Sequence, residues 1–217
     1  MIDKITTYLF NPLLIFSRLW RMIYFPLLYL FDLSLENQDT IRHSHMLSLV
    51  YSIITSCLTP YTYYLAYNNY WLSSQINSNV TEFIYNFSLS YFLSDLYVGL
   101  QYYPKTLNSN KLTSYIHHGA YIALFIYGKY YNKLYLFIYG MPYEIPTILL
   151  NIQYVTNNYN NCKLFGLLFL FFRIFHNIFL LYKTLNIHND LFIFNICTFI
   201  LHVYWFYGYV NKYIFLR

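Results

Sequence analysis

The sequence predicts an all-α fold, a polytopic membrane bundle of six to seven transmembrane helices, and three observations support this. The 217-residue chain is 58% hydrophobic and only 10% charged, whereas soluble domains carry about 25% charged residues. Its apolar residues gather in segments that approach the roughly 20 residues needed to cross a bilayer core of about 30 Å. The loops between these segments are short and contain Asn, Pro and Lys. A bilayer is the solvent that suits so apolar a surface.

Six apolar segments are predicted to cross the membrane: Ser44–Tyr67, Val80–Tyr103, Leu112–Tyr127, Leu134–Val155, Leu164–Tyr182 and Leu191–Val210. A further apolar stretch, Tyr8–Phe31, contains Arg18 and Arg21 on one helical face. It is either a seventh transmembrane helix, which we favour, or an amphipathic helix lying in the interface. We therefore divide the chain into an N-terminal apolar segment (1–43), a six-helix transmembrane domain (44–211) and a short basic tail (212–217).

Charge and cysteine content exclude several classes of protein. The net charge of +5 comes from 13 scattered Lys and Arg residues, without the basic patch of a nucleic-acid-binding protein, so no nucleic-acid partner is predicted. Cys57, Cys162 and Cys197 match no zinc pattern and are expected to be small buried residues. We predict no metal and no cofactor. The 29 Tyr and 20 Phe indicate the codon bias of an AT-rich genome, such as that of a protist or a large DNA virus.

Four of the predicted helices carry a stripe of polar residues at helical spacing. The stripes are Ser88, Tyr91 and Asp95; Glu144, Thr147 and Asn151; Arg173, His176 and Asn177; and Asn195, Thr198 and His202. Ionisable groups at membrane depth cost about 2.5–3.5 kcal/mol each on insertion scales, so these stripes are predicted to face the bundle interior. His45 and the pair His117–His118 lie near helix starts and would reach the same interior.

Two prolines, Pro142 and Pro146, flank Glu144 in the fourth segment. Each removes a backbone donor and is expected to free a carbonyl one turn earlier, near Phe137–Ile138 and at Pro142. Such a broken turn in lipid must face protein or water. The sequence therefore predicts a kinked helix and an enlarged cavity beside Glu144.

Two interpretations of the polar interior stay open. In the structural one, Arg173 neutralises Asp95 or Glu144 and the histidines bond backbone carbonyls, which holds the helices together. In the functional one, His117, His118 and Asp95 form a catalytic site, with imidazole as base and the carboxylate as its orienting partner. A substrate-binding site would then be lined by Glu144, Thr147, Asn151, Arg173, His176 and His202.

Several short motifs resemble those of the TLC-domain family, which includes the TRAM proteins, the Lag-type ceramide synthases and the CLN-type membrane proteins. The second segment contains Tyr91-Phe92-Leu93-Ser94-Asp95-Leu96, similar to the family's aromatic segment with an internal Asp. The His117–His118 pair matches the family's paired histidine. Glu144-Ile145-Pro146-Thr147 with Asn151, and Phe171-Phe172-Arg173-Ile174, resemble motifs of the branch outside the synthases. Arg42, Ser44 and His45 resemble the entry to the first core helix.

The resemblance implies a lipid-related role in binding, sensing or membrane lipid homeostasis, in the endoplasmic reticulum or a related host membrane. Ceramide synthases of this family pair the His-His with a downstream His-Asp-x-x-Asp, whereas this chain has Pro142-Tyr143-Glu144-Ile145-Pro146-Thr147 there. Membrane lipids are therefore the predicted partners. The alternative is a ceramide-synthase-like N-acyltransferase that uses long-chain acyl-CoA and a long-chain base, so whether the protein is an enzyme stays open.

Two other function classes fit the sequence poorly. Di-iron membrane hydroxylases resemble one another in boxes of closely spaced histidines, and the spacing of His43, His45 and His117–His118 does not match those boxes. An ion channel would carry rings of acidic residues, whereas these stripes include the positive charge of Arg173.

Overall fold

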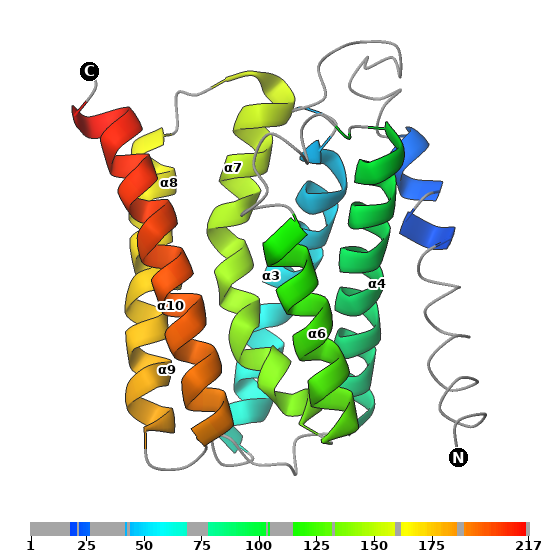
Figure 1. Ribbon diagram of the computed structural model, residues 1–217, viewed down its shortest axis with the longest axis vertical. Coiled ribbons are helices and arrows are strands. Elements are labelled where there is room, and N and C mark those ends of the chain that lie inside the picture. The colour runs from blue at the N-terminus through cyan, green and yellow to red at the C-terminus, as the bar shows by residue number, and fades with distance from the viewer. Residues whose placement is uncertain are drawn as a thin grey trace.

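The fold is known from a computed structural model, which describes residues 18–20, 22–26, 42, 44–68, 78–102, 104, 115–131, 133–158, 162–185 and 189–215. These residues are almost all helical, and no strand occurs among them. The all-α prediction is therefore confirmed. Six helical stretches run alternately up and down and pack side by side as a bundle (Figure 1).

Three stretches are formed wholly or largely by one α-helix each: α3 (Met46–Asn68), α4 (Ser78–Tyr102) and α6 (His117–Tyr130). The other three change helix type along their length. They are η2 (Leu134–Glu144) with α7 (Ile145–Thr156); α8 (Cys162–Phe169), η3 (Leu170–Phe175) and α9 (His176–Thr184); and α10 (Asn189–Val210) with η4 (Asn211–Phe215). The η2 segment is a 3₁₀ helix, and η3 and η4 are π-helical. The predicted segments match these stretches to within a few residues, and Leu112–Ser114 of the third lie outside the described residues.

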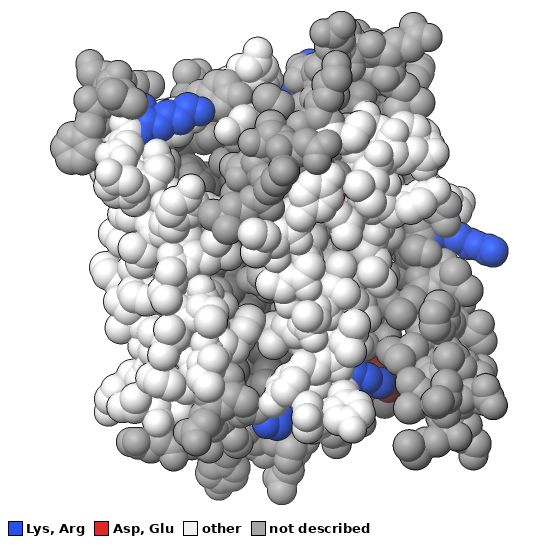
Figure 2. All heavy atoms as spheres, viewed as in Figure 1, with Lys and Arg blue, Asp and Glu red and all other residues white. Residues whose placement is uncertain are grey.

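The outer surface of the bundle is apolar. Two of the described helices, Lys163–Thr184 and Phe192–Tyr213, are long and apolar enough by themselves to cross a bilayer. On α10, Ile193, Ile200 and Tyr204 are 61%, 63% and 57% exposed. In Figure 2 most of the Lys and Arg side chains in view lie toward the two ends of the bundle, one projects from the right edge near mid-height, and the band over α6 and α10 is white. This surface suits contact with lipid tails.

The cysteine prediction is wrong for two of the three residues. Cys57 on α3 and Cys197 on α10 are both exposed free thiols, because each lies on the outward side of its helix. The side chain of Cys162 lies outside the described residues. An outward thiol on an apolar helix surface meets lipid, where its weak polarity costs little.

A short N-terminal segment packs against α4. Trp20 and Tyr24 are fully buried, and the Trp20 indole Nε1 donates to Ser90 Oγ at 3.0 Å. The Trp20 ring lies 5.1 Å from that of Phe87 and 5.5 Å from that of Tyr91. Within the predicted Tyr8–Phe31 helix, residues 18–20 and 22–26 are helical, and the remainder lies outside the described residues.

Glycines bring two pairs of helices into close contact. A Cβ atom on Gly166 of α8 would overlap the ring of Tyr209 on α10, and one on Gly128 of α6 would lie 2.6 Å from the Phe137 ring of η2. Small residues permit this approach in membrane bundles, where close packing replaces the hydrophobic effect between helices.

Candidate functional site

The polar residues of α4 and α6 meet at Asp95 and His118. His118 Nε2 lies 3.4 Å from Asp95 Oδ2, and each side chain is only 10% exposed. The carboxylate orients the ring so that Nδ1 points elsewhere, and Nδ1 is buried without a hydrogen-bond partner among the described residues. An imidazole with one nitrogen held by a carboxylate and the other unbonded can form a hydrogen bond with a further group, or accept a proton from it.

His117 turns toward α10 instead. Its ring lies 4.6 Å from the ring of Tyr121 and 5.3 Å from that of Trp205. Within the described part of the chain, neither His117 Nδ1 nor Trp205 Nε1 has a hydrogen-bond partner, although both atoms are buried. Buried polar groups are nearly always bonded in native proteins, so unpaired ones call for an explanation, such as a water or a ligand.

Arg173 lies in the π-helical turn η3, and three helices hold its side chain. Its Nε donates to the Tyr143 carbonyl at 2.8 Å and its Nη2 to Thr147 Oγ1 at 2.7 Å. The guanidinium carbon lies 5.1 Å from the Phe169 ring and 5.5 Å from the Trp205 ring, which are favourable cation–π distances. Single π-helical turns occur frequently at functional sites.

Pro142 and Pro146 lie close to the two backbone carbonyls that bond the side chains of His176 and Arg173. In a 3₁₀ helix the N–H of residue i bonds to the carbonyl of residue i−3, so Pro142, which lies in η2, has no N–H to offer the Tyr139 carbonyl. His176 Nε2 lies 2.9 Å from that carbonyl, and Arg173 donates to the Tyr143 carbonyl, just before the α-helical turn that contains Pro146. The sequence prediction placed the first free carbonyl at Phe137–Ile138 because it assumed α-helical geometry. Its second prediction, a free Pro142 carbonyl, is wrong, because that carbonyl accepts from the Ile145 N–H.

Glu144 lies near Arg173 and Thr147. The Thr147 hydroxyl accepts from the Arg173 guanidinium and donates to the Tyr143 carbonyl at 3.4 Å, while the Glu144 carboxylate interacts electrostatically with Arg173. The opposite charges therefore offset each other inside the bundle. The helix changes from 3₁₀ to α between Glu144 and Ile145, at the place where the kink is predicted, and the kink itself stays a prediction.

Trp205 connects the histidine pair with the arginine site, because its ring contacts both His117 and the Arg173 guanidinium. We call the resulting set the central cluster: Asp95, His117, His118, Glu144, Thr147, Arg173 and Trp205. The structure brings His118 to Asp95, and Arg173 to Thr147, as separate contacts from different helices. Of the acidic, imidazole and guanidinium groups in the cluster, only Glu144 lines the cavity described below, so a common pocket for all of them stays a prediction. The catalytic and binding roles of these residues stay predictions.

Three of the predicted site residues have other partners. Asn151 belongs to a separate α3–α7 contact, in which its Oδ1 lies 2.7 Å from His45 Nδ1 and its Nδ2 donates to Ser48 Oγ at 3.0 Å and to Ser52 Oγ at 3.4 Å. His176 bonds Tyr139 and the Tyr63 hydroxyl. His202 lies beside the central cluster, with Nδ1 3.2 Å from Asn177 Nδ2 and its ring 4.8 Å from that of Tyr143.

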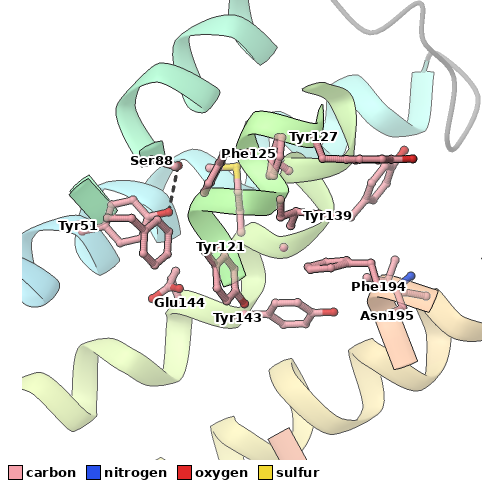
Figure 3. Close-up of a pocket in the computed structure, with 16 residues that line it drawn as sticks. Tyr51, Ser88, Tyr121, Phe125, Tyr127, Tyr139, Tyr143, Glu144, Phe194 and Asn195 are labelled. Atoms are coloured by element: carbon pink, nitrogen blue, oxygen red, sulfur yellow. Dashed lines mark hydrogen bonds between the residues drawn. The ribbon is translucent and has the colours of Figure 1, made fainter. Parts of the chain in front are cut away.

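A cavity of about 60 Å³ lies next to the central cluster, between α6, η2 and the neighbouring helices. Its walls are mostly aromatic and aliphatic, and Glu144 and Tyr143 line it. In Figure 3 Glu144 lies beside Tyr51 and Tyr121, whereas the Tyr143 phenol extends toward Phe194 and Asn195. His117 and His118 do not line the cavity. Their rings contact Phe92, which lines it.

Two residues of the site were missed by sequence reasoning. Trp205 continues the stripe of α10, three residues after His202, and this spacing is the signal that could have identified it. Tyr143 precedes Glu144, and the abundance of tyrosine in the chain hid it. No group of three His, Cys, Asp or Glu side chains in the described ranges could hold a metal ion.

A family model described as the TLC domain, of the TRAM, LAG1 and CLN8 group, matches residues 42–211. The matched range begins beside α3 and ends at the first residue of η4, so it covers the six helical stretches of the bundle apart from residues 212–215. No curated protein and no solved structure shows a significant match to the chain.

Proposed function

This chain belongs to the TLC-domain family, and on that premise we propose that it is a multi-pass membrane protein that binds a lipid inside its helix bundle, in a role of lipid sensing or membrane lipid homeostasis. We place it in the endoplasmic reticulum or a related host membrane, as the family implies. The observation that carries the proposal is the aromatic cavity with a charged residue, Glu144, in its wall.

The cavity combines the two properties that a lipid site needs. Aromatic and aliphatic side chains such as Phe92, Phe125 and Phe194 form most of its walls and suit an apolar chain or ring. Glu144 and Tyr143 supply the few polar groups that orient a ligand. An intramembrane ionisable residue on such a wall is by default a functional group.

Native mass spectrometry of the purified protein tests this proposal directly. We expect a lipid adduct on the wild-type protein and its loss in Gly140→Leu, because Gly140 lines the cavity and a Cβ there has room, 3.8 Å from the Tyr143 ring. The matched control is Gly208→Leu, where a Cβ meets open space on the exposed side of α10. Equal adducts on both variants would show that the lipid lies elsewhere.

The Asp95–His118 pair supports a second candidate, an N-acyltransferase acting on acyl-CoA and a long-chain base. In this reaction the amine nitrogen of the long-chain base would attack the thioester carbonyl of acyl-CoA while His118 takes a proton from that amine. The C–N bond forms, the C–S bond breaks, and CoA leaves as the thiol. Asp95 would orient the imidazole. Against it, neither His117 nor His118 lines the cavity.

Lipid mass spectrometry of membranes that express the protein separates the two candidates. The lipid-binding proposal expects no new amide lipid in wild-type membranes. A new amide that disappears with His118→Ala, but persists with Gly208→Leu at equal expression, would establish the transferase instead.

A further inference from the structure

Tyr143 lines the cavity and has a buried hydroxyl that lacks a hydrogen-bond partner among the described residues. The whole residue is 2% exposed. Figure 3 shows the Tyr143 ring beside Phe194 and near Asn195. An unpaired buried hydroxyl costs free energy, so the site is completed by a group that can donate to it or accept from it.

The charge of the surroundings selects among such groups. Glu144 is already offset by Arg173, whose guanidinium also donates to Thr147. A charged head group would leave a net charge in a low-dielectric interior, which is expensive unless another partner compensates it. A neutral hydroxyl leaves the balance unchanged and pairs with a phenol as donor or as acceptor.

From these two observations we infer that the cavity binds an uncharged lipid alcohol, with its hydroxyl on Tyr143 and its hydrocarbon part along the aromatic wall formed by Phe125, Phe137 and Phe194. This inference rests on the proposed lipid-binding function and specifies its ligand class. It assigns to Tyr143 the selection of the head group, and to Glu144 with Arg173 the rejection of charged ones.

A photolabelling experiment tests the inference. Tetradecanol carrying a diazirine within its chain is incorporated into phosphatidylcholine nanodiscs that hold the full-length protein, and labelled peptides are identified by mass spectrometry. The competitors, at equal mole fraction, are tetradecanol, tetradecane, tetradecylamine and tetradecanoic acid. We expect label on α6 and η2, and competition by the alcohol about five- to tenfold better than by the hydrocarbon, as one net hydrogen bond provides.

Two tyrosine variants isolate the hydroxyl. Tyr143→Phe removes only the unpaired group and should reduce the preference for alcohol over hydrocarbon to less than about twofold. Tyr85→Phe is the matched control, because Tyr85 is also buried with an unpaired hydroxyl among the described residues but does not line the cavity. This variant should keep the wild-type preference.

The outcomes distinguish a failure of the lipid-alcohol inference from a failure of the proposed lipid-binding function. Label spread over the outer helix surfaces, without enrichment at the cavity, contradicts lipid binding there and both proposals fail. Label in the cavity with equal competition by alcohol and hydrocarbon leaves lipid binding standing and overturns the alcohol. Stronger competition by the amine or the acid likewise overturns it, because the site would then select a charge.

Discussion

The α3–α7 contact and the central cluster both place histidine and other polar side chains between helices, but they differ in how their polar atoms are bonded. In the first, both side-chain atoms of Asn151 are bonded, to His45, Ser48 and Ser52, and the His45 ring stacks on Tyr154 at 4.2 Å. In the second, His117, His118 and Trp205 each have a buried nitrogen without a described partner. Saturated hydrogen bonding indicates a structural contact, whereas unpaired polar atoms beside a cavity indicate a site that awaits a ligand.

The largest expected effect on stability is that of Arg173→Met, which removes the positive charge of the central cluster. Removing the guanidinium leaves Glu144 buried without its counter-charge and the Tyr143 carbonyl without its Arg173 donor. We expect the free energy of unfolding in mixed micelles to fall by about 3–5 kcal/mol. The double variant with Glu144→Gln should recover part of this loss, and an equal or larger loss in the double variant would argue against coupling between the two residues.

Asn151→Leu tests the α3–α7 contact. The substitution keeps the volume but leaves His45 Nδ1 and Ser48 without their partner, so unfolding should become easier by about 2 kcal/mol. The lipid adduct seen by native mass spectrometry should remain. If the adduct disappeared while the folded protein persisted, Asn151 would belong to the binding site after all.

A double-mutant cycle on Asp95→Asn and His118→Gln measures the coupling across α4 and α6. The 3.4 Å contact between partly screened groups should give a coupling energy of about 1 kcal/mol. Chemical denaturation of the four proteins supplies the numbers. Strictly additive effects would mean that the carboxylate does not orient the imidazole.

Tyr143→Phe should have the smallest effect on stability. Its hydroxyl has no bond to lose among the described residues, so the free energy of unfolding should change by less than about 0.5 kcal/mol. The thermal midpoint of the delipidated protein measures this. A loss of unfolding free energy above about 1 kcal/mol would show that the Tyr143 hydroxyl makes a structural hydrogen bond, like the polar atoms of the α3–α7 contact.

The bundle itself follows from the sequence, because long apolar runs separated by polar breakers determine both the number and the ends of the helices. The inward position of Asp95, Thr147 and His202 was also predictable, since each is buried as its helical spacing requires. Which partner each of these polar side chains bonds could not be predicted from the sequence. The stripe of Glu144, Thr147 and Asn151 is one pattern in sequence, yet its last member bonds α3 and its first two face Arg173, because the distribution depends on how neighbouring helices rotate about their axes.

The 3₁₀ winding of η2 has a mechanical consequence. Its 11 residues rise about 2.0 Å each and cover about 22 Å, whereas an α-helix of equal length would cover about 16 Å. Relaxing this stretched coil, for instance by replacing Pro142, would shorten the stretch by about one α-helical turn and shift the depth of Glu144 in the bilayer accordingly. The winding of the backbone, rather than the count of residues, therefore sets the height at which the carboxylate stands opposite Arg173.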